Sequence, residues 1–360
     1  MKILILVDKF TGGAGNIAQL MSIELSKRGY VVTLGLMDHL AKLSESRYPL
    51  HGVELVYMAP SSDKNRFSLF IHLIRERIKL FNDTKPDIII SFLTRNNVIS
   101  SFAAKYCHIP IIVSERSNPL ALREPFPWYI LQRLSYKYAN IIAVQFECFK
   151  GFLKSIEMNK YRCLPNVVVH NEHYKRIYKR DSAVLRLVAV GSLRHVKNYN
   201  GMIDIIHLAR ETGMELQLDI YGSGPQINEI NAKIRSYNLQ NIVILKGNVK
   251  EIHKILPNYD VYVMTSHHEG FPNALCEAMS SGLPCVAYMC HDGFKELIQD
   301  GYNGYLVTSE DKHSFVRRLE ELFDSALREY IGTNAREISN RYSVDKVAGI
   351  WINSIEELNV

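Results

Sequence analysis

The chain has 360 residues, of which 47% are hydrophobic and 22% are charged. This composition excludes a disordered chain, a collagen-like repeat and a small disulfide scaffold, and the length favours two packed domains. The net charge of +6 is by itself weak evidence for a nucleic-acid-binding protein, and we expect no nucleic-acid partner.

The six cysteines show no metal-binding spacing, as expected of reduced thiols in a cytosolic protein. The N-terminal apolar run is too short for the core of a signal peptide. No stretch reaches the roughly 18 uncharged apolar residues of a transmembrane helix. We therefore expect a cytoplasmic protein that does not span a membrane but can lie on its surface.

Apolar runs rich in β-branched residues alternate with helix-periodic stretches, which is typical of parallel sheets covered by helices. In the first half, strands are predicted over residues 3–7, 30–36, 53–58, 87–92, 110–114 and 140–144. A glycine cluster at 11–16 follows the first strand and precedes a helix predicted over 16–28. Gly13, Gly15 and Ala18, with Asp38 further on, fit a dinucleotide fingerprint. This turn can therefore bind a phosphate, serve an NAD-dependent oxidoreductase, or bind no ligand.

The same alternation restarts after a polar, basic stretch at 171–183, so we predict two Rossmann-like, doubly wound α/β domains. Strands are predicted over 185–192, 215–224, 241–248, 260–266, 283–288 and 304–307. We assign residues 1–165 to the first domain, 166–340 to the second and 341–360 to a final helix. Its apolar side is predicted to hold Val344, Val347, Ile350, Trp351 and Ile355.

Two glutamates eight positions apart give the most specific chemical signal. Glu269 follows a predicted strand, and Glu277 lies two turns into the helix that comes next. Carboxylates at these places can accept hydrogen bonds from hydroxyl groups, as they do when proteins bind sugar diols. The helix start, with its free N–H groups and dipole, favours negative charge.

The segment EGFPNALCEAMSSGLPCVA, residues 269–287, resembles the E-x7-E segment of glycosyltransferase family four. The resemblance extends over most of the chain, through the early glycine loop, LPN at 164–166, VGSLRHVKN at 190–198, IYGSGP, KGNV and the last helix. It implies the GT-B fold, with two Rossmann-like domains facing a central cleft and the C-terminal helix crossing back to the first domain. It also implies a retaining transferase that uses a nucleotide sugar.

Carried over by position, the resemblance implies that Glu277 binds ribose, Glu269 holds donor-sugar hydroxyls and Lys197 neutralises the diphosphate. The family usually has arginine where this chain has Ser192, and Arg194 is a possible substitute. Further donor-binding positions are Gly13, Gly222, Asn248, Val249, Phe271, Pro272, Asn273 and Ala274. For Gly222, Gly224, Asn248 and Val249, ordinary strand-to-helix turns explain the residues equally well.

Arg116 stands where many family members place a histidine near the reacting sugar, and it completes a predicted catalytic set with Glu269 and Lys197. Arginine stays protonated and cannot act as a general base, so its role would be electrostatic or positional. Glu115 beside it can orient it, touch the acceptor, or form a buried ion pair. The sequence has no Asp-x-Asp and no metal-spaced cluster, so we expect neither a metal nor another cofactor, and His267-His268 does not indicate zinc.

Residues 1–165 hold 22 Lys and Arg against 13 Asp and Glu, a net charge of +9, and the remainder of the chain carries −3. Two basic amphipathic segments, 66–81 and 123–138, lie in this first half, which binds the acceptor in similar enzymes. Segment 66–81 can lie in a membrane interface or can be a helix that packs within the domain and has a solvated face. This charge favours an anionic acceptor or membrane surface. Together with the resemblance, it leads us to expect a UDP-sugar donor, a polyprenyl-diphosphate-linked or other glycan acceptor, an anionic membrane surface and a role in surface polysaccharide (O-antigen or capsule) assembly. The NAD-dependent oxidoreductase and a non-catalytic nucleotide-sugar-binding protein are the alternatives.

Overall fold

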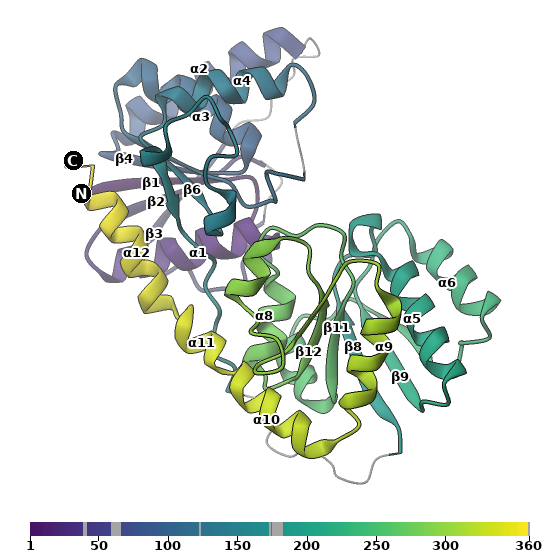
Figure 1. Ribbon diagram of the computed structural model, residues 1–360. Coiled ribbons are helices and arrows are strands. Elements are labelled where there is room, and N and C mark those ends of the chain that lie inside the picture. The colour runs from purple at the N-terminus through teal and green to yellow at the C-terminus, as the bar shows by residue number, and fades with distance from the viewer. Residues whose placement is uncertain (39–41, 59–65, 122–123, 173, 175–182, 359–360) are drawn as a thin grey trace. The chain divides into compact units, whose positions relative to one another are not determined.

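The computed structural model of the chain describes residues 1–38, 42–58, 66–121, 124–172, 174 and 183–358. Two compact units divide the chain, and each is described by itself. Met1–Val167 with Val344–Val360 form the first unit, and Val168–Ser343 form the second. Each unit is built around one parallel sheet with helices on both faces (Figure 1). The predicted fold class of two doubly wound α/β domains is confirmed.

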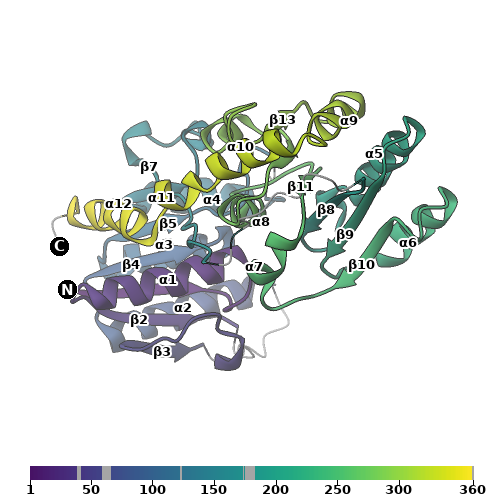
Figure 2. The ribbon, with the colours of Figure 1, turned by 90° about the horizontal axis from the view of Figure 1, so that it is seen from below.

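The first unit contains a seven-stranded sheet in the order β3-β2-β1-β4-β5-β6-β7, and Figure 2 shows β3 and β7 toward opposite edges. Its strands are β1 (Lys2–Val7), β2 (Val31–Leu36), β3 (Val53–Tyr57), β4 (Ile88–Phe92), β5 (Ile111–Ser114), β6 (Ile141–Val144) and β7 (Tyr161–Cys163). One face carries α1 (Gly12–Lys27) and α12 (Val344–Glu356); the other carries α2 (Arg66–Thr84), α3 (Thr94–Cys107) and α4 (Trp128–Ser135). Every residue of β4 is buried, because a central parallel strand is covered on both faces.

The second unit contains a six-stranded sheet in the order β10-β9-β8-β11-β12-β13. Its strands are β8 (Leu185–Val190), β9 (Leu216–Tyr221), β10 (Val243–Gly247), β11 (Val261–Met264), β12 (Cys285–Tyr288) and β13 (Tyr305–Val307). Its helices are α5 (Tyr199–Glu211), α6 (Ile227–Ser236), α7 (Ile252–Ile255), α8 (Asn273–Ser280), α9 (Lys312–Glu321), α10 (Ser325–Ala335) and α11 (Glu337–Arg341). Figure 1 shows α8 on one side of the strands and α5, α6 and α9 on the other.

In both sheets the strand order reverses once, between β1 and β4 in the first unit and between β8 and β11 in the second. Open α/β sheets bind their ligands outside the carboxyl ends of the strands at such a switch point. The loops that follow β1, β4, β8 and β11 are therefore the first places to look for chemistry.

Three local predictions need correction. Helix α1 begins at Gly12, inside the glycine cluster, four residues before the predicted start. The three-residue strand β7 pairs with β6 and was not predicted, because so short a run shows no periodicity. On α12, Val347, Trp351 and Ile355 are buried as predicted, but Ile350 is 41% exposed.

No helix in the described part of the chain combines the length and hydropathy needed to cross a bilayer.

Candidate active site

The two catalytic residues predicted in the second unit are in direct contact at its switch point. Lys197 ends a short 3₁₀ turn, His195–Lys197, after β8, and Glu269 lies in the loop after β11. Lys197 Nζ lies 2.6 Å from Glu269 Oε1, and the two side chains are 22% and 12% exposed. An ammonium and a carboxylate thus meet, partly shielded from water, where a nucleotide ligand is expected.

Other groups hold the Glu269 loop against the loop after β8. The Ser266 hydroxyl donates to Glu269 Oε1 at 2.7 Å, so this oxygen receives two donors. The backbone N–H of His267 donates to the Val196 carbonyl at 2.9 Å. Thr265 Oγ1 donates to the Asn198 carbonyl at 2.9 Å. Ser266 was not predicted, although its place at the carboxyl end of β11 was a usable signal.

His291, in the loop after β12, is a second residue that sequence reasoning missed. Its Nδ1 accepts from the Gly293 N–H at 3.1 Å, so Nε2 carries the proton and donates to the Gly270 carbonyl at 3.3 Å. Burial lowers the pKa of the imidazole, which keeps this neutral tautomer at pH 7. The neighbouring Cys290 thiol donates to the Ser266 carbonyl at 3.0 Å. The β12 loop therefore supports both ends of the segment that carries Glu269.

Helix α8 presents its amino end beside this loop. It starts at Asn273, directly after Pro272, and Ala274 lies in its first turn. Phe271 is 5% exposed and packs edge-on against Tyr342, with ring centroids 5.6 Å apart. Glu277 is half-buried on the same helix. The amino end of α8 brings backbone N–H groups and the positive end of the helix dipole to this edge.

The glycines of the neighbouring turns have a packing reason. Gly222 has φ +148°, and a Cβ on it would lie 1.8 Å from the Gly191 carbonyl oxygen. A Cβ on Gly224 would lie 2.4 Å from the Leu193 carbonyl oxygen. The loop after β9 can therefore approach the loop after β8 only without side chains at these positions.

The remaining donor-site candidates surround these turns. Asn248 Nδ2 donates to Ser223 Oγ at 2.8 Å, which joins the loops after β10 and β9. Val249 is 36% exposed. Ser192 and Arg194 lie in the loop after β8, which leads to Lys197, and Arg194 is exposed. These residues line the carboxyl edge of the sheet on the β9 and β10 side of the Lys197–Glu269 pair.

In the first unit, a polar network of the exposed Asp8 and the buried Asn96 and Arg77 occupies the switch point. Asn96, after β4, donates to Asp8 Oδ1 at 2.9 Å, directly after β1. Arg77 of α2 is 2% exposed and donates to Asn96 Oδ1 at 2.8 Å. Burial lowers the pKa of Arg77 to about 10, which leaves it charged at neutral pH, and burial raises the pKa of Asp8.

The glycine cluster lies next to this network. Gly13 is half-buried in the first turn of α1. A Cβ on Gly15 would lie 2.3 Å from the Phe10 carbonyl oxygen, so close helix packing accounts for this glycine. One glycine of the dinucleotide fingerprint, Gly15, thus has a packing cause that needs no dinucleotide.

Glu115, after β5, is a buried acid at the carboxyl edge of the first sheet. It is 3% exposed and accepts hydrogen bonds from the Tyr136 hydroxyl, from Thr94 Oγ1 at 2.9 Å and from Gln132 Nε2 at 3.3 Å. Burial raises its pKa. A pocket of about 640 Å³ opens here, lined by Thr94, Glu115, Ser117, Pro119, Glu124, Tyr129, Gln132, Phe152 and Leu153. Hydroxyl, amide and carboxylate groups with two aromatic rings suit a sugar ligand.

Arg116, predicted to lie at the reacting sugar, is 9% exposed inside the first unit. Its guanidinium donates to Ser114 Oγ at 2.7 Å, to the Leu164 carbonyl at 2.8 Å and to Asn166 Oδ1 at 3.0 Å. The rings of Phe92 and Trp351 flank it at 5.4 Å and 5.3 Å. Burial lowers its pKa to about 9. The sequence left an electrostatic and a positional role open for Arg116, and these contacts favour the positional role.

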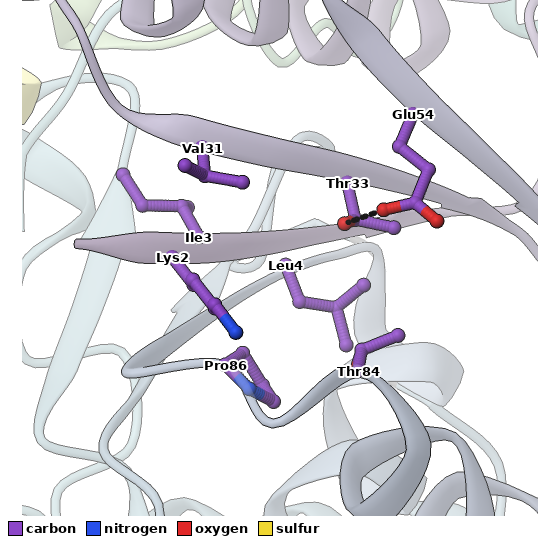
Figure 3. A pocket seen from close by; sticks show the side chains of 8 residues that line it. All are labelled: Lys2, Ile3, Leu4, Val31, Thr33, Glu54, Thr84 and Pro86. Carbon is purple, nitrogen blue, oxygen red and sulfur yellow. Dashed lines mark hydrogen bonds between the residues drawn. The ribbon is translucent and has the colours of Figure 1, made fainter.

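A further pocket in the first unit lies at the opposite, amino edge of the sheet (Figure 3). It is lined by Lys2, Ile3, Leu4, Val31, Thr33, Glu54, Thr84 and Pro86, and Thr33 donates to Glu54 at 3.1 Å. Ligands of doubly wound sheets bind at the carboxyl edge, so this pocket is not a candidate site. Among the described residues, no group of three or more His, Cys, Asp or Glu side chains is placed to hold a metal ion.

Comparisons with known proteins find a family match within the second unit. Residues 171–338 match the family model described as "Glycosyl transferases group 1". The chain is 27% identical over 364 residues to the amylovoran biosynthesis glycosyltransferase AmsD of Erwinia amylovora, covering 97% of this chain and 98% of the relative.

Two further similarities extend this result. The chain is 25% identical over 309 residues to "GalNAc-alpha-(1->4)-GalNAc-alpha-(1->3)-diNAcBac-PP-undecaprenol alpha-1,4-N-acetyl-D-galactosaminyltransferase" of Campylobacter jejuni, covering 83% of this chain and 84% of the relative. The fold superposes on Anabaena HepE in complex with UDP and glucose with a TM-score of 0.84, at 17% identity and 99% coverage of both chains. These matches do not favour the NAD-dependent oxidoreductase or the non-catalytic binding protein. The chain is a glycosyltransferase with the GT-B fold, and its residues 171–338 match the glycosyl transferases group 1.

Proposed function

We propose that this chain is a retaining glycosyltransferase of family four that moves a hexose or N-acetylhexosamine from a UDP-sugar to a polyprenyl-diphosphate-linked or other glycan acceptor. The observation that carries the proposal is the Lys197–Glu269 pair, with 2.6 Å between Nζ and Oε1 at the switch point of the second unit. A cation beside a carboxylate matches a donor in which a diphosphate adjoins a hydroxyl-bearing sugar. The C. jejuni relative is named for a PP-undecaprenol-linked acceptor, which supports this acceptor class.

In this proposal each donor group meets a residue of complementary chemistry. Lys197 neutralises the diphosphate, aided by the exposed Arg194 and the amino end of α8, as negative charge builds on the leaving phosphate. Glu269 accepts hydrogen bonds from hydroxyls of the transferred sugar, and Glu277 from those of the ribose. Charge compensation then comes from the chain itself, without a bound metal, so a chelator is expected to leave the rate of transfer unchanged.

We further propose front-face displacement. The acceptor oxygen forms its bond to the anomeric carbon on the face from which the phosphate departs, and a phosphate oxygen takes the proton of the acceptor hydroxyl. The configuration at the anomeric carbon is therefore retained. No protein base is needed, which agrees with arginine at position 116.

The acceptor side of the proposal uses the pocket beside Glu115 in the first unit. Its carboxylate and amide groups accept and donate hydrogen bonds to sugar hydroxyls, and Tyr129 and Phe152 offer ring faces for a sugar to stack on. A lipid-linked acceptor would place the enzyme at the inner face of the cytoplasmic membrane, in surface polysaccharide biosynthesis. Turnover against a panel of UDP- and GDP-sugars with lipid-linked acceptor extracts, followed by mass spectrometry, would identify both substrates.

The donor assignment predicts opposite effects of two substitutions on nucleotide binding. Glu269→Gln should reduce the rate of transfer by at least about 100-fold, as loss of a group that acts in the transition state does. It should leave the affinity for UDP unchanged or higher, because Lys197 loses its counter-ion within the protein. Lys197→Met should weaken UDP binding at least about tenfold, because the Glu269 carboxylate then faces the diphosphate without a cation. Calorimetric titration with UDP and a transfer assay measure both quantities.

The double variant tests whether the two residues act together. The double variant lacks the Lys197 cation, but it also lacks the Glu269 carboxylate that would repel the diphosphate. It should therefore bind UDP more tightly than Lys197→Met alone. Glu211→Gln, an exposed carboxylate of the same unit, serves as the control and should change neither quantity. If Glu269→Gln weakened UDP binding as much as it slowed transfer, the assignment of Glu269 to the sugar would be wrong.

A further inference from the structure

Helix α4 and the residues next to it expose a row of large apolar side chains. Phe126, Ile130, Leu134 and Tyr138 follow one another at intervals of four residues and are 80%, 43%, 47% and 45% exposed. Ile130 and Leu134 share one face of α4, because residues four apart lie on the same face of a helix, whereas Phe126 precedes the helix and Tyr138 ends the 3₁₀ turn after it. We call these four residues the α4 stripe.

The opposite side of the same segment is polar and buried. Gln132 is 6% exposed and donates to Glu115, and Ser135 is fully buried. Helix α4 thus faces inward with Gln132, Ser135 and the packed ring of Trp128, and it leaves Ile130 and Leu134 facing outward, where a surface helix ordinarily carries polar residues. Each large apolar side chain left in water forgoes the stabilisation that burial provides, so an apolar partner is expected to cover the stripe.

The charged residues within α4 and directly after it are positive, and Glu124, two residues before Phe126, is paired with Arg95 at 3.5 Å. Residues 125–146 contain no Asp or Glu, and they include Arg133 and Lys137. Lys105 of α3 places Nζ 5.6 Å from the centre of the Tyr138 ring, which brings a third cation to the end of the stripe. An apolar row flanked by cations is complementary to an anionic lipid surface. A symmetric second copy is disfavoured, because it would bring Arg133 and Lys137 close to their own counterparts.

The other basic segment predicted from the sequence does not present such a row. In α2, Phe70 packs edge-on against Phe102 and Trp128, with ring centroids 6.1 Å and 6.0 Å away, and Arg77 is buried. Over residues 68–84, no large apolar side chain is exposed. The side chains of Arg66 and Phe67, and residue Arg123 of the second segment, lie outside the described parts of the chain.

We propose that the α4 stripe inserts into the interface of an anionic phospholipid bilayer, with Arg133 and Lys137 at the headgroups. This deepens the proposed function, because it names the surface by which the first unit would reach a lipid-linked acceptor. The binding itself requires no turnover and is tested without an acceptor.

Co-sedimentation of the full chain with vesicles tests the proposal. We expect binding to phosphatidylcholine vesicles that contain phosphatidylglycerol, and at least tenfold weaker binding to pure phosphatidylcholine vesicles. The double variant Ile130→Ser with Leu134→Ser should weaken binding to the anionic vesicles at least tenfold. The matched control is Ile227→Ser with Ile350→Ser, whose wild-type side chains are 42% and 41% exposed elsewhere on the chain, and it should bind like the wild type.

Three further tests separate insertion from misfolding and from binding by charge alone. Trp128 lies beside the stripe, whereas Trp351 is fully buried, so brominated lipids that quench the tryptophan fluorescence report insertion near α4. Both double variants should unfold at the wild-type temperature, which excludes misfolding as the cause of lost binding. Arg133→Gln with Lys137→Gln should weaken binding to anionic vesicles and leave binding to neutral ones unchanged.

Several results would overturn the proposal: undiminished vesicle binding by the stripe variant, equal binding to both kinds of vesicle, or a stripe-dependent dimer in sedimentation velocity without vesicle binding. The membrane surface and the proposed reaction can be refuted independently of each other. Transfer to a detergent-solubilised acceptor without vesicle binding would refute only the membrane surface. Vesicle binding without any transfer would refute only the proposed reaction.

Discussion

Glu269 is held by side chains and loops that come from three neighbouring strand ends. Lys197 follows β8, Ser266 follows β11, and His291 follows β12. Because Lys197 and Ser266 bind the carboxylate at 2.6 and 2.7 Å and His291 holds the Gly270 carbonyl next to it, the carboxylate has little freedom to rotate. A carboxylate fixed before the donor arrives loses little entropy when the donor binds, which is the benefit of preorganisation.

His291 predicts a pH dependence of stability. Its pKa is lowered in the folded protein, so below the ordinary value of 6.5 the unfolded chain binds more protons than the folded one. The free energy of unfolding should therefore fall as the pH is lowered from 7 through the window beneath 6.5, and level off below the folded pKa. His291→Gln should remove this part of the pH dependence, as measured by urea unfolding at several pH values.

The exposed His268, on the same edge of the sheet, provides the control for His291. His268→Gln should preserve the pH dependence of the wild-type protein. An unchanged pH profile in His291→Gln would show that another group is responsible for the loss of stability.

At the scale of elements, α12 completes the first unit although it comes from the far end of the chain. Trp351 is fully buried, with its ring 5.8 Å from that of Phe92 and against the Arg116 guanidinium. Arg116 also binds the Leu164 carbonyl and Asn166, close to where the chain leaves this unit. One buried guanidinium thus joins β5, the outgoing segment and the returning helix.

Truncation of Trp351 should therefore destabilise the first unit strongly. We expect Trp351→Ala to lower the free energy of unfolding of this unit by about 3–5 kcal/mol, as loss of a buried aromatic side chain does. Ile350→Ala, one residue earlier and 41% exposed, should cost far less. Urea unfolding of both variants measures the difference, and equal effects would show that α12 is not packed as described.

At the scale of the whole molecule, both units repeat one plan, a parallel sheet with a single switch point and polar side chains just beyond it. The two sites differ in chemistry. The second unit brings an ammonium and a carboxylate together, whereas the first links the exposed Asp8 to the buried Asn96 and Arg77. The sequence charge differs in the same way, because residues 1–165 carry +9 and the remaining residues −3.

The chemistry of the second unit predicts which nucleotide stabilises the protein. UDP should raise the unfolding temperature, because a ligand that binds only the folded state adds about 2.7 kcal/mol at 100 times its dissociation constant. NAD should have no effect, because packing accounts for Gly15 in the glycine cluster of α1. Differential scanning calorimetry with each nucleotide decides the point, and stabilisation by NAD alone would contradict the donor assignment.

Much of the fold follows from local sequence. In the described parts of the chain, every strand except β7 forms where an apolar run predicts it, because buried parallel strands need continuous β-branched residues. Strand β7 has three residues and acquires its geometry from pairing with β6. The glutamate pair and Lys197 were also readable from the sequence, because their spacing and the strand ends before them are local features.

Tertiary structure decided what depends on contacts between distant residues. Periodicity shows that α4 has an apolar side. Only the hydrogen bond from Gln132 to the buried Glu115 shows that the opposite side faces inward, so that Ile130 and Leu134 face outward. Arg116 has the sequence context of a site residue, yet residues 48 and 50 positions away bind its guanidinium in the interior. The sequence by itself determined which segments form sheets and which residue types can bind a sugar nucleotide, since both depend on short-range pattern. Only the tertiary structure decided which of those residues meet, because burial and hydrogen bonding are set by neighbours that the chain brings together from far apart.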